Sequence, residues 1–292
     1  MVATTPPAAV PRRASPAARM LLTLGFFLLV LTTLAFIALP IVAIFVHVAP
    51  STLLHELTNP LVLDALVVSA KTTLISQALI LVFGTATAYF LASRRFRGRS
   101  LAITLIELPI VLPPAAAGLG LLVAFGRVGL LGSTFDALGI NVAFNQAAVV
   151  LAVTFVAGPF YVRQGIAAFE SVDETMVAAS RTLGAGPLRT FSRVTVPIAA
   201  GGLAAGQAIA MARGLGEFGA TIMFAGSLQG RTQTLPLAVY YAFELPNGLD
   251  VALAISAILT LVSLAILLTA KVISGSYLFR RGTGRNPTVA LD

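Results

Sequence analysis

The chain has 292 residues, of which 58% are hydrophobic and 10% are charged, and its formal net charge is +8. Soluble domains carry about 25% charged residues, so this composition excludes a fold covered entirely by water. The basic residues lie in short clusters beside apolar stretches without interleaved aromatic residues, which favours a membrane protein over a nucleic-acid-binding one. The sequence has no Cys, and its two His lack further ligands at a suitable spacing, so we expect no metal site.

Six apolar stretches are long enough to cross the hydrocarbon core, which takes about 20 helical residues. The predicted spans are Met20 to Val46, Thr72 to Ser93, Ala102 to Phe125, Ala147 to Ala168, Val194 to Met223 and Val251 to Ala270. The second span has an alternative start near Leu63, which would place Lys71 inside it, and the sixth has an alternative end at Ile273. The predicted fold class is an all-α polytopic membrane protein.

Basic residues alternate between the loops and indicate the orientation of the spans. They cluster before the first span, after the second, after the fourth and after the sixth: Arg12, Arg13, Arg19, Arg94, Arg95, Arg97, Arg99, Arg181, Arg189, Arg193, Lys271, Arg280, Arg281 and Arg285. The opposite loops carry chiefly Arg127 and Arg231. Because basic loops stay in the cytoplasm, we expect a multi-pass protein of the cell (inner) membrane with both termini cytoplasmic.

The predicted domain organisation has three parts. Residues 1–19, rich in Ala, Pro and Arg, are expected to be a disordered cytoplasmic tail. Residues 20–276 would form the membrane domain in contact with lipid, and residues 277–292 a cytoplasmic C-terminal tail. The first apolar stretch is too long for a signal peptide and lacks a cleavage site, so we expect it to be retained.

The cytoplasmic loop between the fourth and fifth spans, about 170–197, is predicted to begin with a short helix. Ser171 and Glu174 fit a capping box, in which each side chain binds the other residue's backbone N–H. Asp173 and Glu174 also place negative charge at the positive end of that helix.

A second helix is predicted to follow in the same loop. Gly184 is placed to end the first helix in the left-handed conformation, and Pro187 suits the first turn of the second. The first helix has a small apolar face, made of Met176, Ala179, Ser180 and Leu183. This face either packs on its own protein or the lipid interface, or docks into a groove of a cytoplasmic partner.

This loop resembles the EAA loop of ABC importer permeases, whose pattern is Glu-Ala-Ala, three residues, Gly, nine residues and Ile-x-Leu-Pro. The matching positions are Ala178, Ala179, Ser180, Gly184, Val194, Val196 and Pro197. Ala178 replaces the Glu of the pattern and Ser180 replaces its second Ala. In this family the loop forms the coupling helix, which inserts into the ATP-hydrolysing subunit. The resemblance therefore assigns coupling to Asp173, Glu174, Ala178, Ala179, Ser180, Arg181, Gly184, Pro187 and Pro197.

Neither of the two Lys lies in a phosphate-binding loop of the form Gly-x4-Gly-Lys-Ser/Thr. We therefore expect no cofactor in this chain and no enzymatic activity. ATP and Mg would be bound by the partner subunit.

Further stretches resemble the molybdate or tungstate importer permeases, with the sulfate permeases next in similarity. They are Leu108–Gly118, Gly126–Gly132, Ala212–Gly226 and Gly230–Tyr240. The resemblance implies a type I ABC importer permease fold, a homodimer with one shared pathway, two cytoplasmic ABC ATPase subunits, and a periplasmic or lipid-anchored oxyanion-binding protein. The alternatives are a sulfate or other oxyanion importer, an ion-coupled secondary transporter and a non-transporting membrane scaffold. No inverted repeat favours the secondary transporter.

Three prolines are predicted to break the third span. Pro109, Pro113 and Pro114 free backbone groups at membrane depth, which is tolerated where protein or a wet cavity covers them. We expect Pro113 and Pro114 either to lie beside the pathway or to form a structural kink.

The fifth span contains three candidate pathway or gate residues. Arg213 and Glu217 are four residues apart and are predicted to share one helix face. Charged side chains avoid lipid, so the two either contact the anion and gate the pathway or form a structural ion pair. Thr221 offers a neutral hydroxyl, which suits an anion that must pass without being trapped.

Two outward-facing basic residues are candidates for contact with a binding protein. Arg127 and Arg231 lie in glycine-flanked turns and would meet acidic residues of the periplasmic partner. The alternative is that each is a solvated loop charge. Glu107, near the start of the third span, is expected to reach cytoplasmic water.

Overall fold

The computed structural model describes residues 16–246 and 248–282, and the side chains of 20–246 and 248–269. By its contacts the chain divides into two units, Met1–Ala49 and Pro50–Asp292. The first unit contains helix α1 (Pro16–His47), whose apolar side chains are exposed along its length, as expected of a membrane-spanning helix. Residues 16–19, which we expected in a disordered tail, belong to this helix; the rest of the predicted tail lies outside the described residues.

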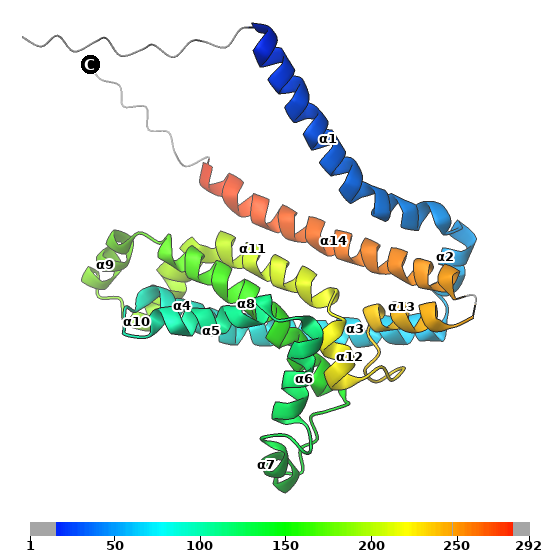
Figure 1. Cartoon of the computed structure of the whole chain (residues 1–292). Coiled ribbons are helices and arrows are strands. Elements are labelled where there is room, and N and C mark those ends of the chain that lie inside the picture. The colour runs from blue at the N-terminus through cyan, green and yellow to red at the C-terminus, as the bar shows by residue number, and fades with distance from the viewer. Residues whose placement is uncertain (1–15, 247, 283–292) are drawn as a thin grey trace, which may run out of the picture. The chain divides into compact units, whose positions relative to one another are not determined.

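The second unit consists of helices joined by loops in its described part (Figure 1). In chain order its elements are α2 (Pro50–Glu56), α3 (Pro60–Leu79), η1 (Ile80–Gly84), α4 (Thr85–Ser93), α5 (Arg99–Val111), α6 (Pro114–Phe125), α7 (Gly132–Ala137), α8 (Gln146–Glu170), α9 (Glu174–Thr182), α10 (Pro187–Thr190), η2 (Phe191–Thr195), α11 (Val196–Leu215), α12 (Gly219–Ala225), α13 (Leu235–Glu244) and α14 (Leu249–Gly282). The π-helical turns η1 and η2 join their neighbours, so Pro60–Ser93 and Pro187–Leu215 each form one long helix.

The described helices include five that are long and apolar enough to cross a membrane, and a sixth span if the bent pair α5 and α6 is counted as one. The earlier start of the second span is confirmed, because α3 begins at Pro60 and includes Lys71. The third span is broken, because α5 and α6 meet at an angle of 116°. The predicted fifth span is too long, because α11 ends at Leu215.

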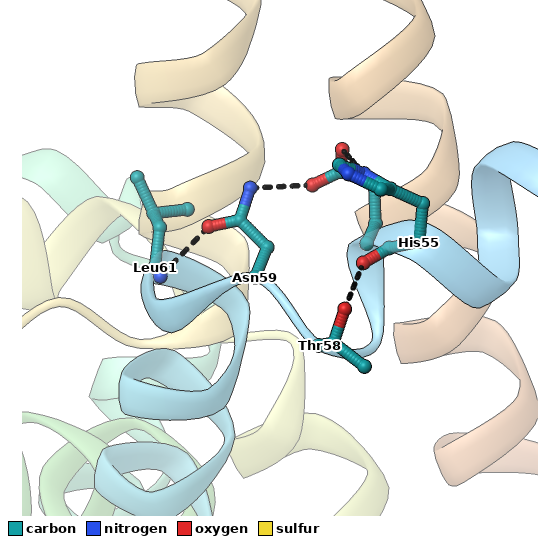
Figure 2. Close-up of polar contacts among 5 residues, drawn as sticks. His55, Thr58, Asn59 and Leu61 are labelled. Carbon is teal, nitrogen blue, oxygen red and sulfur yellow. Dashed lines mark hydrogen bonds and ion pairs between the residues drawn. The ribbon is translucent and has the colours of Figure 1, made fainter.

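At the corner between α2 and α3, a half-buried polar cap rests on one buried carboxylate (Figure 2). The Asn59 side chain accepts a hydrogen bond from the Leu61 backbone N–H (3.0 Å) and donates one to Oε2 of buried Glu56 (2.7 Å). His55 Nδ1 lies 3.3 Å from the other Glu56 oxygen, and the Thr58 hydroxyl donates to the His55 carbonyl (2.8 Å). These contacts satisfy the first free backbone donor of α3 and fix the start of the long helix.

The core of the second unit is built around α8. One buried cluster joins α8 to α4 and α11, a second joins it to α6 and α12, and a third lies between α3, α13 and α14. Tyr161 of α8 is fully buried, its ring lies against Gly84 and its hydroxyl is 2.6 Å from the Thr85 hydroxyl. Figure 1 shows α9 and α10 at one end of this unit and α2 and α13 at the other, so the two ends are separated by the full length of the spans.

Candidate functional site

The α9 helix starts with a single-residue cap. The Asp173 side chain accepts a hydrogen bond from the Thr175 backbone N–H at 2.8 Å, and this bond lowers the pKa of the Asp173 carboxyl below its ordinary value. The predicted capping box is wrong, because the Ser171 hydroxyl donates instead to the Ala168 carbonyl at the end of α8. Asp173 rather than Ser171 is the N-cap, because it directly precedes the first helical residue, Glu174, where Asp is a favoured cap.

The turn between α9 and α10 follows the sequence prediction closely. Gly184 has a φ of +81°, its N–H donates to the Arg181 carbonyl (3.0 Å), and the Ala185 N–H donates to the Ser180 carbonyl (3.1 Å). This pair of bonds is a Schellman motif, and it confirms that Gly184 ends the helix in the left-handed conformation. Pro187 occupies the first turn of the next helix, as predicted.

We call residues 173–190 the knuckle, because α9 and α10 fold back on each other at the end of the unit (Figure 1). A contact of 3.1 Å between the Ser180 and Thr190 hydroxyls joins the two helices. The second helix is not separate, since α10 continues through η2 into α11 and Pro197 lies inside this continuous stretch. A displacement of the knuckle would therefore act directly on the Pro187–Leu215 helix.

The knuckle exposes large apolar side chains. Leu183 is 88% exposed, Leu188 is 78% exposed and Met176 is also exposed, whereas Val177 packs toward the α4–α8–α11 cluster. The large apolar side chains of the predicted face, Met176 and Leu183, thus do not pack on the described part of their own unit. Of the other members, Ala179 is exposed and Ser180 is half-buried against Thr190. The coupling residues Ala178 and Arg181 are exposed and line a neighbouring hollow.

That hollow has a volume of about 860 Å³ and lies between the knuckle and the ends of α4 and α8. Its charged lining residues are Arg95, Arg99, Glu170, Glu174 and Arg181. Arg99 closes one side, because its Nη2 lies 2.5 Å from Glu170 Oε1 and its Nε donates to the carbonyl of Leu91 (2.7 Å).

The second region of interest is the break between α5 and α6. Pro109 lies within α5, Pro113 precedes α6 and Pro114 occupies its first turn, and the last two are exposed. A proline ring fixes φ and removes the backbone donor, so two successive prolines end one helix and start another. The predicted break in the third span is confirmed.

The third region is the break between α11 and α12. Arg213 Nη2 lies 2.7 Å from Glu217 Oε2, and Glu217 Oε1 accepts a hydrogen bond from the Ala220 backbone N–H (2.7 Å). The two side chains form an ion pair although they do not share a helix, because Glu217 lies between the end of α11 and the start of α12. Thr221 is fully buried, and its hydroxyl has no hydrogen-bond partner in residues 16–246 and 248–282.

The two breaks meet. A Cβ atom added to Gly219 would lie 2.7 Å from Cβ of Pro114, and one added to Gly118 would lie 2.6 Å from the Ala220 carbonyl oxygen. Such distances leave room for hydrogen only, so α6 and α12 touch through their glycines. The structure thereby brings Pro114 close to the segment that holds Glu217 and Thr221.

A buried polar face of α3 was missed by the sequence analysis. Its members are Ser69, Thr72, Thr73, Ser76 and Gln77. The Gln77 side chain accepts a hydrogen bond from Gln207 Nε2 (2.7 Å), and the Ser76 hydroxyl donates to the Val150 carbonyl (3.0 Å). The spacing of these polar residues at three and four positions along an apolar span was the available signal.

The sequence analysis also missed an ion pair between α5 and α8. Arg163 of α8 lies with Nε 3.5 Å from Glu107 Oε1 of α5. The prediction that Glu107 reaches water considered that residue alone, and Arg163 was overlooked as a single charge within the fourth span.

The two arginines that we predicted to face outward occupy separate loops. Arg127, between α6 and α7, has its Nε 3.8 Å from Asp136 Oδ1, and both side chains are exposed. Arg231 is exposed in the loop between α12 and α13, where Gln229 donates to Asp64 (3.0 Å). Among the described residues, no group of three or more His, Cys, Asp or Glu is placed to hold a metal ion.

Solved structures define the class of this fold. A chain of a bacterial alginate ABC transporter, solved in complex with a periplasmic protein, superposes with a TM-score of 0.66 at 16% identity and covers 88% of this chain and 95% of its own. The broken, all-helical bundle is therefore an ABC importer permease fold.

Sequence comparison places the chain in a family. Residues 80–275 match the family described as the binding-protein-dependent transport system inner membrane component. The molybdenum transport system permease protein ModB of Mycobacterium tuberculosis is 43% identical over 237 residues, covering 80% of this chain and 88% of the relative. The sulfate transport system permease protein CysW of Synechocystis is 35% identical over 251 residues, covering 83% and 90%.

The chain belongs to the binding-protein-dependent transport system inner membrane component family. It is a multi-pass membrane protein and a transport component rather than an enzyme. The resemblance drawn from the EAA-type loop and from the stretches in the third and fifth spans is confirmed.

Proposed function

We propose that this chain is the membrane-spanning permease subunit of an ATP-driven ABC importer that carries molybdate or tungstate across the inner membrane. The observation that carries the proposal is its 43% identity, over most of both chains, to a relative named as a molybdenum permease. A sulfate importer is the second candidate, because a sulfate permease is 35% identical over a similar length.

In this proposal the knuckle faces the cytoplasm and receives the force of ATP hydrolysis. The basic loops on its side of the membrane support this orientation, with both termini cytoplasmic. The exposed side chains of Met176, Leu183 and Leu188 suit a groove in a separate ATPase subunit, which would bind ATP and Mg. Asp173, Gly184 and Pro187 hold the knuckle in shape by their caps and turn.

The working assembly would be a homodimer with two ATPase subunits and a periplasmic or lipid-anchored oxyanion-binding protein. Arg231 is the more available contact for an acidic binding protein, because Arg127 is already near Asp136. An exposed arginine in a loop favours rapid encounter with an acidic partner more than it adds affinity.

The breaks at Pro113–Pro114 and Gly216–Phe218 would be the joints of the pathway. When ATP closes the ATPase pair, the knuckles approach each other and the Pro187–Leu215 helices rock until the pathway opens outward. After hydrolysis the helices relax and the ion leaves to the cytoplasm. Arg213 is already paired with buried Glu217, so we assign the pair a structural role at the joint, and Thr221 a place beside it.

Reconstitution tests the proposal. The chain is placed in lipid vesicles with its cognate ATPase and binding protein, and ATP hydrolysis is measured with molybdate, tungstate or sulfate. We expect molybdate and tungstate to stimulate hydrolysis and sulfate to have little effect. Stimulation by sulfate alone would favour the second candidate, and transport without an ATPase would refute the importer.

A further inference from the structure

We infer that Arg163 and Glu107 line the cytoplasmic half of the ion pathway, and that Arg163 makes a transient contact with the oxyanion before release. The inference rests on the proposed function, which supplies the oxyanion as cargo. It assigns a role to a pair of charged residues that belongs neither to the knuckle nor to the segments that form the two helix breaks.

Two ion pairs connect α5 and α8, and their spacing along the helices gives the depth of the pair farther from the knuckle, here called the inner pair. Arg99, at the start of α5, pairs with Glu170 at the end of α8, and Glu107 further along α5 pairs with Arg163 further back along α8. The two helices therefore run antiparallel. At 1.5 Å per residue, the inner pair lies about 10–12 Å farther from the knuckle end than the outer pair.

The inner pair, Arg163 and Glu107, lies on the surface of the protomer and is not covered by its other described helices. The Arg163 side chain is 71% exposed and the Glu107 side chain 37% exposed. Arg163 lies on α8, which is long and apolar enough to span a membrane, and Glu107 lies on α5, which passes the same test together with α6. A charged side chain that faces lipid at the bilayer centre costs about 2.5–3.5 kcal/mol. We therefore assign a water-filled vestibule to this face.

The hollow beside the knuckle lies where the start of α5 meets the end of α8, at the knuckle end of the contact between these two helices. It is lined by Arg99 and Glu170 of the outer pair and by Arg95 and Arg181, none of which is fully buried. Arg163 stands seven positions before Glu170, which is two turns of the same helix face. Arginine side chains thus follow one another from the membrane interior to the cytoplasmic rim.

The geometry of the inner pair suits a brief contact. A single separation of 3.5 Å leaves most of the guanidinium N–H groups available for the oxygens of a tetrahedral anion. Glu107 neutralises Arg163 between passages and repels the dianion, so the ion is not trapped. Arg213 differs, because its contact with buried Glu217 is shorter, at 2.7 Å.

Thiol labelling tests the vestibule, since the chain has no Cys of its own. In inside-out vesicles holding the complete complex, Arg163→Cys is treated with a positively charged methanethiosulfonate reagent. The matched control is Leu105→Cys, at a similar depth on α5 and exposed on a different face of that helix. We expect at least tenfold faster labelling of Arg163→Cys, slowed by molybdate. Equal, slow labelling of both would mean that lipid or a second copy covers the face, and would overturn the inference.

Uptake of radioactive molybdate separates an ion contact from a structural ion pair. We expect Arg163→Gln to reduce uptake at least fivefold, with stimulated ATP hydrolysis within twofold of the unchanged complex. The Arg163→Gln, Glu107→Gln double variant removes both charges and should remain as defective. Uptake restored in the double variant would overturn the inference alone. Absence of oxyanion-stimulated hydrolysis in the unchanged complex would contradict the proposed function as well.

Discussion

The knuckle and the two helix breaks all interrupt helical structure, but their backbone groups and side chains find partners in opposite ways. The knuckle closes with its own cap and Schellman turn and leaves Leu183 and Leu188 exposed. The segments beside the two breaks touch each other, with Gly118 and Gly219 at the contact and Glu217 accepting a hydrogen bond from the backbone of the next helix. The knuckle satisfies its own backbone hydrogen bonds but exposes apolar side chains, so it needs a partner to cover them. The two breaks are stabilised by contacts with other helices of the unit, so they can serve as joints.

The largest expected effect lies at the joint. Replacing Arg213 by Gln leaves the buried Glu217 carboxylate without its ion-pair partner, which should destabilise the protein by about 3–5 kcal/mol. Thermal unfolding of the purified complex measures the change. Arg213→Gln combined with Glu217→Gln should recover most of the loss, and a double variant as unstable as the single one would contradict the structural role.

The next effect should appear at the knuckle and spare the fold. Leu183→Asp adds a charge to the surface that docks on the ATPase, so we expect the affinity for that subunit to fall by about 2 kcal/mol. A pull-down with purified ATPase measures it. Leu130→Asp, equally exposed in the loop after α6, is the control and should bind normally. Similar behaviour of the two variants would remove the knuckle as the docking surface.

A smaller effect should distinguish the two glycines of α6. Gly118→Ala places a methyl group against the backbone of Ala220, which should cost about 1–3 kcal/mol of stability. Gly120→Ala meets no atom within 4 Å and should be neutral or slightly stabilising. Unfolding of both variants in detergent compares them, and equal stability would show that α6 and α12 do not touch as closely as described.

The smallest effect concerns the turn of the knuckle. Gly184→Ala forces a side chain into the left-handed conformation, at about 1 kcal/mol, whereas Gly186→Ala changes a glycine with a φ of −67° and open space around it. We expect only Gly184→Ala to weaken coupling, measured as oxyanion-stimulated ATP hydrolysis. A stronger defect in Gly186→Ala would mean that the turn works in another way.

Local signals in the sequence predicted the features that depend on neighbouring residues. The left-handed Gly184, the start at Pro187 and the break at Pro113–Pro114 follow from the backbone chemistry of glycine and proline. The capping box failed because Asp173 competes with Ser171 for the same helix start, and the pattern alone does not decide between them.

Features that depend on distant residues were not predictable in the same way. The 116° angle between α5 and α6 is accompanied by the contact of Gly118 with α12, about a hundred positions away in the chain. Periodicity placed Arg213 and Glu217 on one helix, but Gly216 ends that helix and the ion pair bridges the end. Arg163 was missed because its partner lies on another helix.

The central claim is that the knuckle protrudes into the cytoplasm and contacts a separate ATPase. Its most direct test is the labelling of Leu183→Cys with a membrane-impermeant thiol reagent, from each side of the membrane. We expect no labelling in intact cells, rapid labelling in inside-out vesicles stripped of the ATPase, and protection when the ATPase is added back. Labelling in intact cells, or no protection by the ATPase, would contradict the claim.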